Sequence, residues 1–119
     1  MKKKILVTGG DGRFASTLKK YNKNLNLVFR SKKELNILDP KSIKQNLLKI
    51  KPKIILHCAS LSRPMSIHEK NIQKSIDINI IGTSNLVKVC SDNNIKIIYF
   101  STGYVYEGIK GNYSEKDSV

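Results

Sequence analysis

The sequence predicts an α/β protein, a Rossmann-like, doubly wound parallel sheet of about five strands with helices on both faces. Short apolar runs of strand length alternate with stretches in which apolar residues recur every three or four positions, as they do in helices. The apolar runs are continuous, which is typical of strands that are buried on both faces of a parallel sheet. Because the crossovers between such strands are right-handed, the connecting helices cover both faces.

The first two predicted strands enclose a helix. The first strand is expected over residues 4–8 and is followed by residues 9–12, three of which are glycine. A helix begins there, and its inward side chains are predicted to be Phe14, Ala15 and Leu18. The second strand is predicted over residues 25–29, and a short third strand over residues 35–37.

The next helix has clear boundaries. Asp39 is a favourable N-cap and Pro40 a favourable first helical residue, while Pro52 ends the helix. Apolar residues recur between them at helical spacing, and residues 54–56 then predict a fourth strand.

A long amphipathic helix is predicted over residues 66–93, before a last strand over residues 95–100. Its buried face is predicted to carry residues spaced three or four apart. These are Ile72, Ile76, Ile80, Thr83, Val87 and Cys90.

Length and composition fit one soluble domain over residues 1–119. The net charge is +13, and residues 1–60 carry 15 basic and 3 acidic side chains. This charge predicts either an anionic partner or a solvated face of lysines, which outnumber arginines 19 to 3. Because arginine clusters and nucleic-acid-binding motifs are missing, we expect no nucleic-acid partner.

The cysteines and the hydropathy bear on the compartment. Cys58 and Cys90 are isolated, which favours a reducing compartment and hence the cytoplasm. Their spacing from the histidines does not match a zinc site, so no metal is expected. No apolar run approaches the roughly 20 residues of a membrane-spanning helix, so no membrane association is expected.

The strongest motif spans Thr8 to Ala15, between a predicted strand and a predicted helix. In a dinucleotide-binding fingerprint, Gly9 would permit the tight turn and Gly12 would let the backbone approach the pyrophosphate. The helix that begins there directs its N-terminus at the phosphates. Arg13 and Phe14, in its first turn, are therefore candidate cofactor contacts as well. A purely structural turn is the alternative.

The end of the second strand selects between NAD and NADP. An acidic residue there binds the ribose hydroxyls of NAD, whereas a basic residue accommodates the 2′-phosphate of NADP. Here Arg30 and Lys32 precede the first acidic residue, Glu34. This order favours NADP, with NAD as the alternative cofactor and solvated surface lysines as the alternative explanation.

Three further segments complete a family pattern. They are the segment 57–60 after the fourth predicted strand, the helical Asn79, and Ser101-Thr102-Gly103-Tyr104-Val105-Tyr106. With the glycine motif, they resemble the extended short-chain dehydrogenase/reductases that act on nucleotide sugars, closest to the dTDP-4-dehydrorhamnose reductases. The resemblance covers residues 3–119.

The resemblance implies roles for several residues. The family's adenine-contacting acidic dipeptide falls on Asn36 and Ile37, so its acid is lost here. The resemblance implies that further residues lie along the cofactor, namely Cys58, Ala59, Ser60 and Ser101. Thr102 matches the catalytic residue that hydrogen-bonds the substrate oxygen.

In the family, that threonine works with a Tyr-x-x-x-Lys pair on the next helix, where Tyr transfers the proton and nicotinamide the hydride. The chain ends 17 residues after Thr102, so we expect the N-terminal cofactor half, without the pair, the sixth strand and the substrate lobe. Tyr106 and Lys110 match the spacing literally, but the glycines around them disfavour a helix.

These features predict the NAD(P)-binding portion of a nucleotide-sugar oxidoreductase that transfers hydride to a 4-keto sugar nucleotide. The alternative is a non-catalytic dinucleotide-binding or regulatory module, because the regulatory subunit of methionine adenosyltransferase resembles the same family. Residues 97–100 would line an unpaired sheet edge, so we expect self-association or dependence on the missing half.

Overall fold

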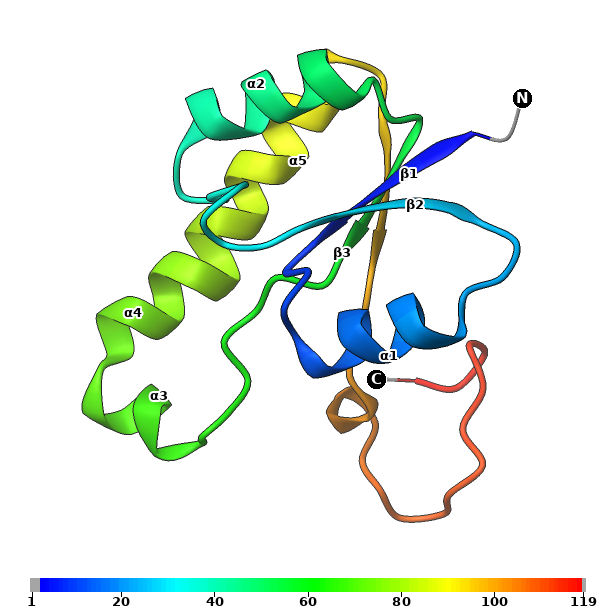
Figure 1. Ribbon diagram of the computed structural model, residues 1–119. Coiled ribbons are helices and arrows are strands. Elements are labelled where there is room, and N and C mark those ends of the chain that lie inside the picture. The colour runs from blue at the N-terminus through cyan, green and yellow to red at the C-terminus, as the bar shows by residue number, and fades with distance from the viewer. Residues whose placement is uncertain (1–2, 119) are drawn as a thin grey trace.

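A computed structural model describes residues 3–118 as a parallel four-stranded sheet with helices on both faces (Figure 1). The strand order is β2-β1-β3-β4. The strands are β1 (Lys4–Thr8), β2 (Asn26–Arg30), β3 (Ile54–His57) and β4 (Lys96–Tyr99). The helices are α1 (Arg13–Tyr21), α2 (Pro40–Ile50), α3 (Ser66–Lys70), α4 (Ile72–Ile76) and α5 (Gly82–Asp92). A π-helical turn, Asp77–Ile81, joins α4 to α5, and a 3-10 turn, Gly103–Val105, follows β4.

The two faces of the sheet are covered differently. In Figure 1, α2 and α5 lie side by side over one face, and α1 lies against the other. The main core fills the space between the sheet and the α2–α5 pair, with Leu6, Ile43, Ile55 and Leu86 fully buried at its centre. The predicted Rossmann-like fold is confirmed. Because all strands are parallel, their carboxyl ends meet at one edge, where such folds bind ligands.

The predicted boundaries of α2 are confirmed. Asp39 is the N-cap, and its Oδ1 accepts the Lys41 backbone N–H at 2.9 Å. Pro40 is the first helical residue. Lys51 ends the helix in the left-handed conformation, and its N–H donates to the Leu47 carbonyl at 2.8 Å.

The prediction of a strand over residues 35–37 is wrong. Leu35 and Ile37 are buried in the core, but their segment is a series of turns. The backbone satisfies its polar groups locally, because the Asn36 N–H donates to the Ser42 hydroxyl at 3.1 Å and its carbonyl accepts the Asp39 N–H at 3.1 Å. Burial therefore needs no strand partner here. The sheet has four strands over residues 3–118 instead of about five.

The long helix over residues 66–93 is also interrupted, and its predicted buried face is only partly correct: Cys90 is buried and Thr83 half-buried. Asn71 breaks it and caps α4, because its Oδ1 accepts the Lys74 N–H at 3.0 Å. The π turn then adds residues to the helical repeat and rotates the face that follows. Four residues of the predicted face are exposed, namely Ile72, Ile76, Ile80 and Val87. The buried residues of α5 are Gly82, Leu86, Val89 and Cys90.

In α1 the predicted inward face is only partly correct. Ala15 is fully buried and Leu18 half-buried, whereas Phe14 is 51% exposed. The Phe14 ring packs edge-on against Phe100 beyond β4, with ring centres 4.8 Å apart. Phe14 therefore joins the helix start to the segment after β4.

Candidate functional site

The carboxyl ends of β1, β2 and β3 surround a cavity of about 330 Å³, the first cavity. Its lining comes from the loops after these three strands and from the π turn. The lining residues are Gly9, Asp11, Gly12, Lys32, Leu35, Asn36, Ile37, Leu38, Cys58, Ala59, Ser60 and Ile78. Six of the predicted cofactor residues besides the glycines meet here, namely Lys32, Asn36, Ile37, Cys58, Ala59 and Ser60. Leu35, Leu38 and Ile78 were not predicted, because only the turn and the π helix bring them to the cavity.

The glycine-rich turn lies directly against the loop after β3. Gly9 has a φ of +65°, and a Cβ built on it would lie 2.7 Å from the Ala59 Cα. The turn closes through the Gly12 N–H, which donates to the Gly9 carbonyl at 2.9 Å. The Gly10 N–H donates to the Arg30 carbonyl at 2.7 Å, so the turn also touches the end of β2. Gly9 therefore meets both the conformational and the steric requirement for glycine.

A buried network joins the same two loops to α5. His57 Nδ1 lies 2.8 Å from the Thr8 hydroxyl, and His57 Nε2 lies 3.0 Å from the Thr83 hydroxyl. The Thr8 hydroxyl also accepts the backbone N–H groups of Cys58 at 3.1 Å and Ala59 at 3.2 Å. Since its two acceptor sites are then used, its hydrogen points to Nδ1, and Nε2–H donates to Thr83.

Burial lowers the pKa of His57 to about 4, so the ring is neutral at physiological pH. Neutrality is what this arrangement requires, because Nδ1 must accept a hydrogen bond. The family resemblance placed His57 at the start of the segment 57–60 that lies along the cofactor, but gave it no chemical role of its own. Its position at the end of a predicted strand was a signal for the cavity edge, but its partner Thr8 lies 49 residues away.

Asn79 fixes the next part of the loop after β3. Its Oδ1 accepts the Leu61 N–H at 2.8 Å, and its Nδ2 donates to the Leu61 carbonyl at 2.9 Å. Asn79 lies in the π turn, a feature that is frequent at functional sites. The side chain therefore substitutes for a neighbouring strand by pairing with both polar groups of one backbone residue.

A second cavity of about 430 Å³ lies on the other side of Gly12. It shares Gly12, Cys58 and Ser60 with the first cavity. The rest of its lining includes Arg13, Phe14, Ala15, Ser62 and Arg63. The two cavities thus flank the start of α1, and the predicted contacts Arg13 and Phe14 belong to the second.

The two cations predicted at the end of β2 point to different places. Lys32 lines the first cavity. The Arg30 guanidinium instead lies against α2, where its Nε donates to Asn46 Oδ1 at 3.1 Å and its Nη1 donates to the Phe29 carbonyl at 3.2 Å. Glu34 forms an ion pair with it at 3.7 Å.

Ser101 and Thr102 follow β4 and are exposed. The Thr102 hydroxyl accepts the Tyr104 N–H at 3.2 Å. Among residues 3–118, neither Ser101 nor Thr102 belongs to the lining of the first or the second cavity. They directly follow Phe100, whose ring packs on Phe14 in the lining of the second cavity.

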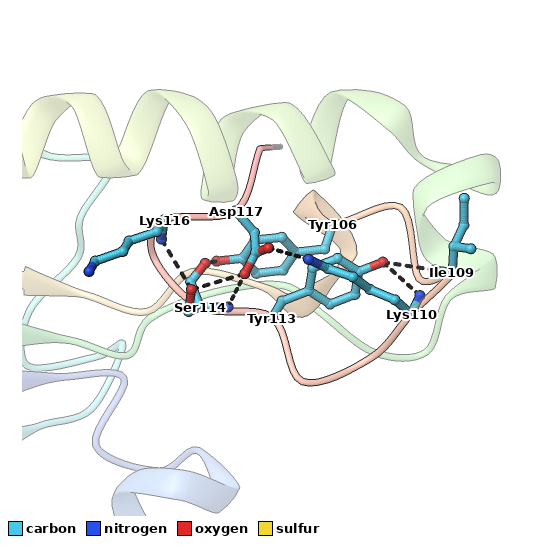
Figure 2. Close-up of polar contacts among 7 residues, drawn as sticks. All are labelled: Tyr106, Ile109, Lys110, Tyr113, Ser114, Lys116 and Asp117. Carbon is cyan, nitrogen blue, oxygen red and sulfur yellow. Dashed lines mark hydrogen bonds and ion pairs between the residues drawn. The ribbon is translucent and has the colours of Figure 1, made fainter.

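Tyr106 and Lys110, which match the Tyr-x-x-x-Lys spacing, are both held by contacts within the C-terminal loop of residues 106–117 (Figure 2). The Tyr106 hydroxyl donates to the Ser114 carbonyl at 3.1 Å, and its ring stacks on Tyr113 with centres 4.7 Å apart. Lys110 forms an ion pair with Asp117, which also accepts the Ser114 N–H at 2.7 Å. The segment is not helical, as predicted.

The remaining groups with reactive or metal-binding potential are the two cysteine thiols and the acidic and histidine side chains. Burial raises the pKa of both thiols, Cys58 and Cys90, to about 11, which keeps them protonated. Within residues 3–118, no group of three His, Cys, Asp or Glu side chains is arranged to hold a metal ion. The same part of the chain contains no helix with the length and hydropathy needed to cross a membrane.

Comparison with known proteins gives one family. The family described as RmlD substrate binding domain matches residues 2–119. Methionine adenosyltransferase 2 subunit beta of Xenopus laevis is 35% identical over 85 residues, which are 71% of this chain and 25% of that protein. The dTDP-4-keto-6-deoxy-D-glucose reductase of Streptomyces niveus is 30% identical over 105 residues, covering 87% of this chain and 36% of that protein.

A solved structure with a similar fold agrees with the family match and with the related reductase. The dTDP-4-dehydrorhamnose reductase of Bacillus anthracis, in complex with NADP, superposes with a TM-score of 0.82 at 28% identity. The match covers 92% of this chain and 40% of the reductase. The chain thus spans well under half the length of these relatives. Its sequence, its parallel sheet and its glycine-rich turn agree with one assignment: the chain belongs to the RmlD substrate binding domain family.

Proposed function

We propose that the chain is the NADP-binding portion of a nucleotide-sugar oxidoreductase, which transfers hydride from the nicotinamide to a 4-keto sugar nucleotide. The observation that carries this proposal is the Gly9–Gly12 turn, seated against Ala59 between two cavities. The NADP bound to the Bacillus anthracis reductase and the activity named for the Streptomyces niveus relative support the choice of cofactor and substrate.

The residues of the site fit a dinucleotide. A Cβ at Gly12 would lie 3.1 Å from the Gly9 carbonyl, so this turn favours glycine and presents bare backbone, which a pyrophosphate could approach at the start of α1. The apolar part of the first cavity, with Ile37 and Leu38, suits the adenine, and Lys32 suits a ribose 2′-phosphate. Arg13 and Phe14 in the second cavity would face the nicotinamide half, which supplies the hydride when bound.

The substrate side of the site is also a proposal. Thr102 would hydrogen-bond the sugar carbonyl oxygen, and Ser101 would lie along the cofactor, as the family pattern implies. A cytoplasmic location agrees with the two protonated, unpaired cysteines.

Calorimetric titration of the chain with NADPH and NADH tests the cofactor assignment. We expect NADPH to bind more tightly, and Gly12→Val to abolish binding of both by crowding the turn and blocking the approach of the pyrophosphate to its backbone. Thr17→Val, on the exposed side of α1, is the matched control and should bind normally. Normal binding by a folded Gly12→Val variant would contradict the proposal.

A non-catalytic module is the second candidate. It is favoured by the 35% identity to a subunit of methionine adenosyltransferase and by the Tyr106 and Lys110 side chains, both of which are engaged within their own loop. On both candidate functions the isolated chain should reduce no dTDP-4-keto sugar at a useful rate, because Tyr106 and Lys110 are not placed as a proton-donating pair. Turnover that disappeared in Tyr106→Phe would contradict this candidate and assign catalysis to that pair.

Association with a second copy or with a further part of the protein is proposed at β4. Over residues 3–118 this strand pairs only with β3, and Ile98, Tyr99 and Phe100 are about half exposed. Unpaired edges of this kind recruit other strands. Sedimentation velocity at high salt, which screens the charge of +13, should detect species larger than a monomer. Association with a dissociation constant in the micromolar range would be detected at about tens of micromolar protein. A stable monomer at that concentration would contradict the proposed association.

A further inference from the structure

At the end of β2, the carboxylate of Glu34 binds to donor groups of the turn that follows the strand. The Ser31 backbone N–H donates to Glu34 Oε2 at 2.8 Å, and the Glu34 N–H donates in return to the Ser31 hydroxyl at 3.4 Å. The other carboxylate oxygen, Oε1, forms the ion pair with Arg30 at 3.7 Å. A backbone N–H and a guanidinium are also the donors that proteins use for phosphate oxygens.

The Glu34 carboxylate helps to hold Arg30 on the α2 side. Arg30 and Glu34 line a separate cavity of about 310 Å³ with Gln45, Asn46 and Lys49, the α2 cavity. Asn46 accepts from Arg30 Nε at 3.1 Å and donates to the Glu34 carbonyl at 2.9 Å. Arg30, Glu34 and Asn46 thus form one connected cluster, while Lys32 alone of the two predicted cations lines the first cavity.

The carboxylate is ionised at neutral pH. The Ser31 backbone N–H, and to a smaller extent the Ser31 hydroxyl and the charges of Arg30 and Lys19, hold the pKa of Glu34 below its usual range. In this type of fold a ribose 2′-phosphate binds at the end of the second strand, so it would meet the Ser31 N–H and the Arg30 guanidinium that the Glu34 carboxylate already occupies. The two anions would compete for these donors and repel each other.

We propose that Glu34 is an internal competitor for the ribose 2′-phosphate and thereby limits the preference of this site for NADP over NAD. This inference rests on the proposed function and names the residue that sets its cofactor specificity. In the resting protein Lys32 is the cation available to the phosphate. When Glu34 is neutral or removed, the Ser31 amide and the Arg30 guanidinium become available as well.

The experiment compares two adenosine ligands that differ in the 2′-phosphate. Calorimetry measures the affinity of the full chain for 2′,5′-ADP and for 5′-ADP. Glu34→Gln removes the charge and keeps the length of the side chain, and Glu34→Ala also frees the Ser31 amide. Glu69→Gln on the exposed surface of α3 removes the same charge elsewhere and serves as the matched control.

We expect Glu34→Gln to tighten 2′,5′-ADP binding about fourfold, the size of an exposed ion-pair effect, and to leave 5′-ADP binding unchanged. Glu34→Ala should tighten 2′,5′-ADP binding at least as much. Glu69→Gln should change neither ligand. The double variant Glu34→Gln/Arg30→Ala should lose the gain, because the released guanidinium is then absent.

Three results would overturn the inference, and they separate it from the proposed function. An unchanged ratio of the two affinities in both Glu34 variants removes the competitor role and leaves the cofactor assignment intact. Weaker binding of both ligands in Glu34→Gln would make Glu34 an acceptor for the ribose hydroxyls. Failure of the unmodified chain to bind either ligand would remove the proposed function and this inference together.

Discussion

Gly9 and Ala59 are in contact across the carboxyl ends of β1 and β3, and the contact leaves no room for a side chain on Gly9. A Cβ at that position would lie 2.7 Å from both the Cα and the N of Ala59. The turn that faces the proposed pyrophosphate is therefore held by its neighbour as well as by its own conformation. This relationship makes the glycine-rich turn and the loop after β3 one structural unit.

Gly9→Ala tests that unit. The positive φ alone should lower the free energy of unfolding by about 1–3 kcal/mol, and the clash with Ala59 adds to this. Gly111→Ala is a matched control, because Gly111 has a φ of +69° but no atom within 4 Å of the added Cβ. Urea unfolding should give the larger loss for Gly9→Ala. Equal losses for the two variants would mean that the backbone relieves the clash.

The stability of the protein should depend on pH through His57. Its pKa is about 4 in the folded protein and 6.5 when unfolded, so the unfolded state binds the extra proton between these values. Stability is therefore complete above pH 6.5 and falls by about 3 kcal/mol as the pH falls to about 4. Urea unfolding across this range measures the slope.

His57→Gln should remove that contribution to the slope, since glutamine does not titrate, at the cost of a lower stability at pH 7. His68→Gln is the control, because His68 lies on α3, where its Nδ1 is 2.7 Å from the Ser75 hydroxyl. The slope should persist in this variant. If the slope persisted in His57→Gln, another group would be responsible for it.

Asn79→Ala should loosen the loop after β3 and weaken cofactor binding. The variant loses both hydrogen bonds to Leu61, each worth about 1 kcal/mol, and leaves that backbone residue to solvent. Amide hydrogen exchange at Leu61 should accelerate. Gln73→Ala, on the exposed side of α4, should leave the exchange unaltered. Unchanged protection of Leu61 in Asn79→Ala would show that the loop is held by other contacts.

Lys32 and Arg30 should contribute unequally to NADPH binding. Lys32→Ala should weaken NADPH binding about tenfold, as expected for loss of a charged hydrogen bond, and spare NADH. Arg30→Ala should have a smaller effect, because Asn46 and Glu34 already hold that side chain. Parallel titrations of the two variants with both cofactors measure this difference. A greater loss in Arg30→Ala would mean that the guanidinium turns to the first cavity when the cofactor binds.

Local sequence determined the four strands that pair in the sheet, the cap of α2 and the glycine-rich turn. Their signals lie within a few residues of one another: the apolar run of residues 4–8, the Asp39-Pro40 pair and the glycines of residues 9–12. The parallel order of the strands then follows from the helices between them, and it brings the loops after β1, β2 and β3 to one edge. The family motifs could therefore locate most of the residues that line the first cavity.

Only the tertiary structure decided which side chains these loops use and where they point. Leu35 and Ile37 are buried without a strand, and Gly82 of α5 makes room for Ile37, since a Cβ there would lie 2.6 Å from the Ile37 side chain. His57 finds Thr8 across 49 residues, and Arg30 turns to Asn46 rather than to the first cavity. Such choices depend on packing and hydrogen bonds between segments that are distant in sequence, and no local pattern of residues encodes them.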